Sequence, residues 1–133
     1  MSNNSFYITT PIYYVNDVPH IGHAYTSLAA DVIARFMRLN GKEVMYLSGT
    51  DEHGQKVEKS ALSKGFSAQE FTDKMSISFR DLLDALNIDY SDFIRTSEER
   101  HKVGVRAFWE KLGEDGDIYR GKYSGWYSLR DEA

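Results

Sequence analysis

The sequence predicts an α/β fold built on a parallel sheet, and three observations lead to that prediction. A short β-rich run covers residues 6–10, an amphipathic helical pattern follows over about 20–40, and a second β-rich run covers 43–48. Parallel neighbouring strands need a crossover connection, which is usually a helix. Strand, helix and strand in this order therefore predict a βαβ unit with a right-handed crossover.

The first strand and the helix are separated by a loop. Residues 6–10, Phe-Tyr-Ile-Thr-Thr, are aromatic or β-branched, as is typical of a buried strand. Pro11 and Pro19, the only prolines of the chain, bound the loop. The helix is expected to begin near His20 and to stop at residues 40–41, Asn-Gly. Its apolar residues recur at helical spacing and predict a single stripe of the kind that packs on a sheet, made of Ile21, Tyr25, Leu28, Ala29, Val32, Ile33 and Phe36.

Two further helices are expected after the second strand. A charged loop covers residues 49–54, and a helix follows to about Ser63. Ser67 with Glu70 three residues later has the pattern of a capping box, which starts a longer helix. The apolar face of this longer helix is expected to comprise Phe71, Met75, Phe79, Leu82, Leu83 and Leu86.

The last third of the chain predicts one more strand, one more helix and a hairpin. Residues 92–96 are expected to form the strand, and residues 97–100 to open the helix. Residues 118–129 alternate aromatic residues with glycines, which favours a hairpin. The apolar face of the last helix is expected to comprise Val105, Phe108, Trp109 and Leu112.

Composition excludes several classes of protein. The chain has 133 residues, 41% of them hydrophobic, which suits one domain with a real core and excludes a disordered chain. It has no cysteine, so a disulfide framework, a thiol nucleophile and a cysteine-ligated zinc site are excluded within it. The formal net charge is −4 and no basic block stands out, so a self-sufficient nucleic-acid surface is not expected. No signal peptide or membrane span is indicated, and we expect a soluble, cytoplasmic protein.

The strongest local motif, His20-Ile-Gly-His23, lies at the junction of the first loop and the helix. A helix N-terminus attracts phosphate through its unpaired N–H groups and its dipole. Two histidines three residues apart can add donors there, and Gly22 leaves room for a flat adenine ring. The alternatives are two histidines that merely cap the helix, or a zinc site completed by Asp51 or His53.

The loop over residues 49–54, Gly-Thr-Asp-Glu-His-Gly, predicts a cation site rather than a phosphate site. It approaches the phosphate-loop pattern, but Gln55 stands where that pattern has lysine, and two carboxylates would repel phosphate. Asp51, at the carboxyl end of a strand, suits the ammonium group of a free amino acid. The alternatives are that Asp51 and Glu52 form a solvated turn, and that Tyr13 and Tyr14 are core aromatics.

These motifs carry a family resemblance. His20-Ile-Gly-His23 is identical to the HIGH signature of class I aminoacyl-tRNA synthetases. Together with residues 10–16, 49–54 and 92–101, in order and with matching gaps, it resembles the bacterial methionyl-tRNA synthetases over nearly the whole chain. The resemblance implies that residues 1–116 are the first half of a Rossmann-like nucleotide-binding catalytic domain. Residues 117–133 are then the truncated start of a connective insertion.

The resemblance also assigns roles to residues. It implies that His20 and His23 are catalytic and bind ATP together with Ile21 and Gly22. It implies a methionine site in which Asp51 and the backbone carbonyl of Ile12 hold the ammonium group. The other members of that methionine site are expected to be Pro11, Tyr14 and His53.

The second signature of the family, KMSKS, is not expected within these residues. Lys74-Met-Ser-Ile-Ser78 is similar to it, but Met75 belongs to the apolar stripe of a helix and Ile77 replaces the second lysine. We expect this pentapeptide to be a packed helical segment. Relatives often carry a zinc knuckle with paired cysteines after a segment like 125–127, whereas Ser128 and Asp131 stand at those places here. Zinc is therefore not expected in this segment.

The activity that the resemblance implies is methionine–tRNA ligation. Methionine and ATP, with Mg²⁺ on its phosphates, would give methionyl-adenylate, and the methionyl group would then pass to tRNA(Met). The isolated chain is expected to be inactive. The alternatives are a nucleotidylyltransferase that uses the similar H-x-G-H pattern, and an ATP-binding fragment without catalysis.

Overall fold

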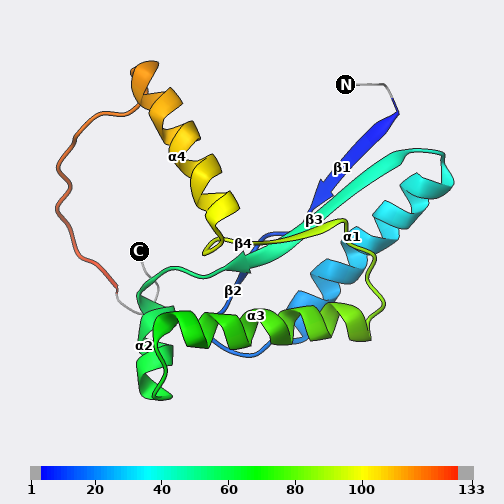
Figure 1. Ribbon diagram of the computed structural model, residues 1–133, viewed down its shortest axis with the longest axis horizontal. Helices are drawn as coiled ribbons and strands as arrows, with labels where there is room; N and C mark the ends of the chain where they lie inside the picture. Colours follow the sequence, from blue (N-terminus) through cyan, green and yellow to red (C-terminus); the bar gives the residue numbers. More distant parts are fainter. Residues whose placement is uncertain (1–3, 129–133) are drawn as a thin grey trace. The chain divides into compact units, whose positions relative to one another are not determined.

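The computed structural model describes residues 4–128 (Figure 1). The chain divides into two compact units, residues 1–102 and residues 103–133. The α/β class expected from the sequence is confirmed. The elements in chain order are β1 (Ser5–Thr9), β2 (Tyr13–Tyr14), α1 (Ile21–Leu39), β3 (Glu43–Asp51), α2 (Gln55–Ser63), α3 (Ala68–Ala85), β4 (Asp92–Arg95) and α4 (Glu99–Glu114).

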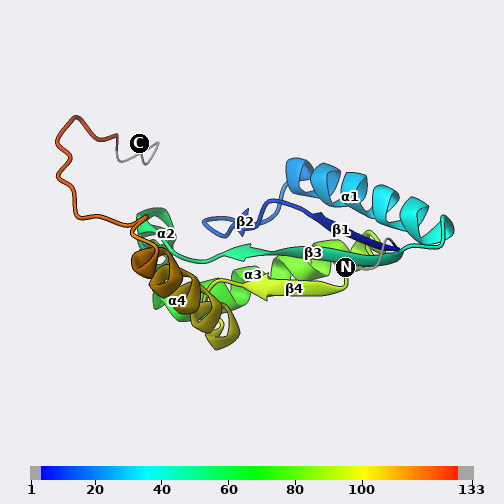
Figure 2. The ribbon, with the colours of Figure 1, turned by 90° about the horizontal axis from the view of Figure 1, so that it is seen from above.

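The sheet is parallel throughout, and β3 is its central strand. Leu47 of β3 lies between Thr9 of β1 and Asp92 of β4. Thr50, further along β3, lies between β2 and β4 in the same way. β1 and β2 therefore occupy the same side of β3 and form one interrupted edge, which brings the carboxyl ends of β2, β3 and β4 together (Figure 2).

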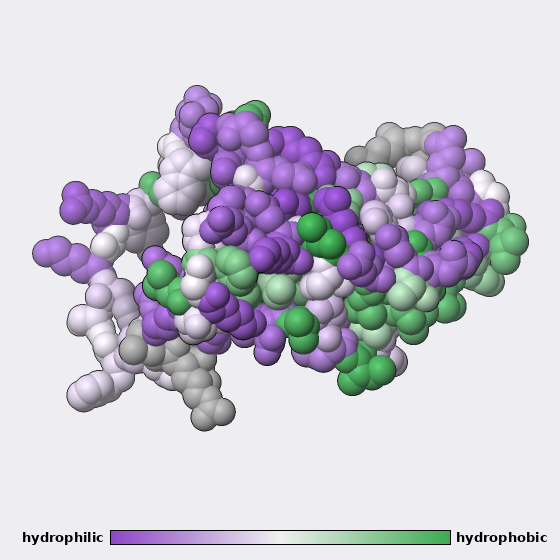
Figure 3. Space-filling view, turned by 60° about the horizontal axis from the view of Figure 1, so that its bottom comes forward, coloured by the Kyte–Doolittle hydropathy of each residue, from purple (hydrophilic) through white to green (hydrophobic). Residues whose placement is uncertain are grey.

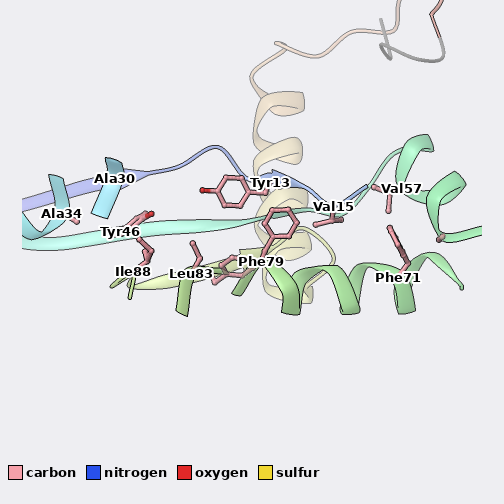
Figure 4. Close-up of a cluster of buried hydrophobic side chains, with 12 residues drawn as sticks. Tyr13, Val15, Ala30, Ala34, Tyr46, Val57, Phe71, Phe79, Leu83 and Ile88 are labelled. Carbon is pink, nitrogen blue, oxygen red and sulfur yellow. The ribbon is translucent and has the colours of Figure 1, made fainter. Parts of the chain in front are cut away.

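The core lies between the sheet and helices α1 and α3, which both pack on one face of it (Figures 1 and 4). Tyr46 of β3 is completely buried there, and its hydroxyl donates a hydrogen bond to the carbonyl of Ser27, 3.1 Å away. Burial is the main reason that the pKa of Tyr46 is raised. The opposite face of the sheet is more open, because Tyr7 and Met45 are 59% and 44% exposed.

Helix α1 begins and ends where the sequence predicts, but its bulky apolar stripe does not pack on the sheet. Ile21, Tyr25, Val32 and Phe36 are all at least 60% exposed, and apolar residues gather on the surface over this helix (Figure 3). The residues that α1 does bury are small or hydrogen-bonded: Ala24, Ser27, Ala30, Asp31 and Ala34. Small side chains let the helix approach the sheet closely, and at about 100° per residue the bulky stripe then points away from it.

Helix α3 behaves as the sequence predicts. The Ser67–Glu70 capping box is present, and both its reciprocal hydrogen bonds form. Phe71, Phe79 and Leu83 are at most 1% exposed, so the stripe is packed into the core (Figure 4). Residues 74–78 lie within this helix, with Met75 packed against the core, which confirms that they are a packed helical segment.

Of the two elements expected in the C-terminal part of the chain, the helix forms and the hairpin does not. Helix α4 forms, but none of its residues is buried, and Phe108 and Trp109 are 66% and 64% exposed. The hairpin expected over 118–129 has no strand among residues 117–128, which the structure describes. Tyr123 and Trp126 are fully or almost fully exposed, and an isolated hairpin without a packed face is marginal in water.

Candidate functional site

The candidate site lies at the carboxyl ends of the strands. We define the strand-end site as residues 20–23, strand β2 and the loop 51–54. β2 joins its parts: the ring of Tyr13 lies 4.9 Å from that of His23, and Tyr14 is paired with Asp51 of β3. The sequence-predicted histidines and Asp51 are therefore carried by adjacent elements of one sheet edge, where open α/β sheets bind ligands.

His20 and His23 cap their own helix. Nδ1 of His20 accepts a hydrogen bond from the Gly22 amide, and Nδ1 of His23 accepts one from the His20 amide, both at 3.1 Å. The two rings stack with their centroids 3.8 Å apart. A Cβ on Gly22 would lie 3.0 Å from Cε1 of His20, so the missing side chain makes room for this ring.

This capping fixes the tautomers of the histidines. A neutral imidazole has one N–H and one acceptor nitrogen, and Nδ1 is the acceptor in both rings. Nε2 therefore carries the proton in each ring and can donate to an anion. Burial, followed by the charge of His20, lowers the pKa of His23, which keeps it neutral at pH 7. The capping interpretation is thus correct in its geometry and compatible with phosphate binding.

Tyr13 belongs to the core and not to the surface of the site. It is 4% exposed, stacks on Phe79 of α3 and shares a 2.6 Å hydrogen bond with the hydroxyl of Ser27. Phe79 also contacts the ring of His23, with centroids 4.9 Å apart. The Tyr13–Phe79 pair therefore supports His23 from beneath.

Tyr14 is half-buried and lies against the loop 51–54. A Cβ on Gly54 would lie 2.2 Å from the Tyr14 hydroxyl, and the φ of Gly54 is +125°. Both facts require glycine at this position. Of the other predicted members of the site, Pro11 and Ile12 are exposed on the loop that precedes β2.

The two neighbouring carboxylates of the loop have opposite surroundings. Asp51 is half-buried, and its carboxylate receives no hydrogen bond from any residue within 4–128. Glu52 is buried and accepts hydrogen bonds from Thr50 at 2.7 Å, from Arg95 at 2.7 and 3.0 Å, and from Ser97. A carboxylate without protein donors at a strand end can accept from a ligand's ammonium group. Asp51 and Glu52 are therefore not a solvated turn.

Sequence reasoning missed the residues that hold this loop. Arg95 reaches both Glu52 and Asp73 of α3, and the Arg95–Asp73 contact measures 2.5 Å. Nε2 of His53 lies 3.3 Å from the carbonyl of Thr96, which ties this exposed histidine to the end of β4. The available signal was Arg95 itself, because a charged residue inside a short strand needs a partner.

Neither a metal centre nor the pocket at the far end of α1 offers a second site. No group of three or more His, Asp or Glu side chains within residues 4–128 could hold a metal ion; Asp131 lies outside that range. The surface pocket at the far end of α1 is lined by Arg35, Arg38, Leu39 and Asp89. Its arginines donate to the carbonyls of Asn87 and Asp89 and so tie α1 to the segment before β4.

No helix within the described residues is long and apolar enough to cross a membrane.

Comparisons with known proteins agree with this geometry. The family model described as tRNA synthetases class I (M) matches residues 6–133. The methionine–tRNA ligase of Rickettsia bellii is 68% identical over 131 residues, which are 98% of this chain and 26% of the relative. That of Listeria monocytogenes is 54% identical and is matched over 97% of this chain and 19% of its own length. The chain thus spans about a quarter or less of these relatives.

Solved structures give the same result. Mycobacterium tuberculosis methionyl-tRNA synthetase in complex with methionyl-adenylate has a TM-score of 0.93 at 44% identity, over 98% of this chain and 26% of its own. A leucyl-tRNA synthetase of Agrobacterium radiobacter, 22% identical with a TM-score of 0.84 over 99% of this chain and 17% of its own, shares the fold. Because the family model covers almost the whole chain, the protein belongs to the class I tRNA synthetases, in the group marked M.

Proposed function

We propose that this chain is the N-terminal part of a methionine–tRNA ligase that acts in the cytoplasm. The observation that carries the proposal is the match of 97–98% of the chain to ligases that are 54–68% identical to it. The methionyl-adenylate bound to the Mycobacterium tuberculosis synthetase supports methionine and ATP as the substrates. The matched relatives favour this activity over a nucleotidylyltransferase.

In the first step of the proposed reaction, a carboxylate oxygen of methionine attacks the α-phosphorus of ATP. The bond to pyrophosphate breaks, and methionyl-adenylate forms. No side chain is needed as a nucleophile, so catalysis rests on positioning and on stabilising charge. The Nε2–H groups of His20 and His23 donate to phosphate oxygens beside the N-terminus of α1, where Ile21 and Gly22 border the nucleotide. Mg²⁺, held by the phosphates and water, neutralises their charge.

Methionine occupies the other half of the strand-end site. Asp51 accepts from its ammonium group, which the absence of donors to that carboxylate among residues 4–128 supports. Pro11, Ile12, Tyr14 and His53 surround the amino acid. In the second step, a hydroxyl of the terminal ribose of tRNA(Met) attacks the activated carbonyl and AMP leaves. We assign residues 117–133 to the start of a connective insertion.

Methionine-dependent exchange of pyrophosphate into ATP tests the proposal. The full-length protein is expected to catalyse it, and residues 1–133 alone are expected to be inactive. Asp51→Asn in the full-length protein should raise the KM for methionine about 10- to 100-fold, the cost of one charge-assisted hydrogen bond, and leave the KM for ATP nearly unchanged. A full-length protein that exchanges pyrophosphate without methionine would overturn the proposal.

A comparison of the wild type with one variant tests the role of His20. His20→Asn keeps a side chain that can cap α1, whereas it removes the Nε2–H donor. His20→Asn should therefore lower kcat while the thermal midpoint stays close to that of the wild type. Equal kcat in the two proteins would remove His20 from the phosphate site.

A further inference from the structure

We propose that Glu52 and Arg95 are positioning residues, which hold the loop 51–54 so that Asp51 and His53 face the substrate. This inference rests on the function proposed above, because it concerns how the same site is held. It assigns neither residue a contact with the substrate.

The first observation is the burial and saturation of the Glu52 carboxylate. Its side chain is 0% exposed, and that of Arg95 is 17% exposed. Two hydrogen bonds from Arg95 and one each from Thr50 and Ser97 reach the two carboxylate oxygens. Thr50 belongs to β3, Arg95 to β4 and Ser97 to the segment that follows β4, so the carboxylate fixes the loop to β3 and β4 together.

Residues 51–53 of the loop are each tied to a neighbouring segment. The Glu52 amide donates to the hydroxyl of Thr96 at 2.9 Å, and the ring of His53 contacts the Thr96 carbonyl. On the other side, the Val15 amide donates to the carbonyl of Asp51 at 3.4 Å. Asp51 is therefore held between β2 and the Glu52–Arg95 pair, while its own carboxylate stays without a donor among residues 4–128.

The energetics favour positioning over simple stabilisation. Removing a carboxylate and a guanidinium from water is costly, and well-packed apolar residues of similar volume often stabilise a fold as well as a buried ion pair does. A buried pair with all its hydrogen bonds made has instead one well-defined geometry. The Arg95–Asp73 contact extends this geometry to α3, and both interactions raise the pKa of Arg95, so the guanidinium stays charged.

The test is steady-state pyrophosphate exchange by the full-length protein with Glu52→Gln. The amide keeps the shape of the side chain but loses its charge and one acceptor, so the loop loses its fixed position. We expect the KM for methionine to rise about 10-fold or more, the scale of effect that a small misplacement of a substrate-holding group has. The KM for ATP should change less than about twofold, because ATP binding does not lose an interaction. A tenfold change in affinity would correspond to a loss of about 1.4 kcal/mol.

The control is a second buried carboxylate, far along α1, whose arginine partner is 46% exposed. Asp31 is 5% exposed and accepts from Arg35 at 2.6 Å and from the Asp89 amide at 2.9 Å. Asp31→Asn should lower the thermal midpoint as Glu52→Gln does, yet leave the KM for methionine unchanged. If both variants raise this KM equally, Glu52 acts through stability alone and the proposal is wrong.

The remaining outcomes are also decisive. If Glu52→Gln does not fold, Ser97→Ala removes a single donor to Glu52 and should raise the KM for methionine about 2- to 10-fold; an unchanged KM overturns the proposal. Should Asp51→Asn impair methionine binding while Glu52→Gln and Ser97→Ala do not, only the positioning role fails. A wild-type protein without methionine-dependent exchange instead removes the proposed function.

Discussion

Helices α1 and α3 have nearly the same length and the same sequence pattern, but they use that pattern in opposite ways. Each carries bulky apolar residues at helical spacing, and each packs on the same face of the sheet. α3 buries Phe71, Phe79 and Leu83, whereas α1 buries alanines, a serine and an aspartate and leaves Phe36 60% exposed. Periodicity therefore predicts the helix, but it does not predict which face of the helix the sheet covers.

The largest expected effect contrasts a phenylalanine from each helix. Phe79→Ala removes a completely buried ring that supports Tyr13 and His23. It should lower the free energy of unfolding of residues 1–133 by about 3–5 kcal/mol. Phe36→Ala on α1 should change it by less than about 0.5 kcal/mol. Urea titrations followed by circular dichroism measure both, and similar losses would show that the α1 stripe is covered.

The next effect tests the buried face of α1. Ala34 is 0% exposed, so Ala34→Leu should cost about 1–3 kcal/mol through overpacking. The neighbouring Ile33→Leu, on the exposed stripe, is the control and should be close to neutral. A neutral Ala34→Leu in the same urea titrations would mean that α1 does not approach the sheet as closely as described.

A smaller effect compares the capping boxes of the two helices. Ser67→Ala removes the side chain that caps α3 and should cost about 1 kcal/mol. His20→Asn replaces one capping side chain of α1 with another and should lie within about 0.5 kcal/mol of the wild type. A loss of stability in His20→Asn comparable to that in Ser67→Ala would show that the imidazole supplies more than a cap.

The smallest effect is the pH dependence that His23 contributes. Its pKa in the folded protein is lowered from 6.5, so the unfolded state binds the proton more readily. The contribution is constant above about pH 6.5, and stability falls as the pH drops from there towards the lower folded pKa. NMR titration of the His23 ring checks the shift. His20→Asn should raise this pKa because it removes the second cause, and an unchanged value would leave burial as the only one.

Strands β1, β3 and β4, the helices and both ends of α1 were predictable because they depend on residues close together in the sequence. Ser67 and Glu70, for example, are three residues apart. β2 was missed, because its two residues lie in a segment expected to be a loop and pair only with β3. The Glu52–Arg95 pair was not predictable, because its partners are 43 residues apart and meet only when β3 and β4 pair. The exposed stripe of α1 and the missing hairpin failed for a related reason: both depend on what lies against a face, which periodicity does not contain.

Of the site itself, the sequence predicted the positions but not the arrangement. His20, His23 and Asp51 lie at strand ends or at the helix N-terminus, as their places in the βαβ pattern require. Their roles came from the family resemblance. The tautomers, the role of Tyr13 as a core residue and the different surroundings of Asp51 and Glu52 depend on contacts in the folded structure.

The self-capping of α1 has a consequence for the entropy of ligand binding. Both imidazoles are already held in one rotamer by backbone amides and by each other before any nucleotide arrives. Immobilising a side chain on binding costs about 0.5–1.5 kcal/mol, and two rings that are already ordered avoid most of that cost. An anion at this helix terminus would therefore meet two donors whose directions are set in advance by the first turn of the helix.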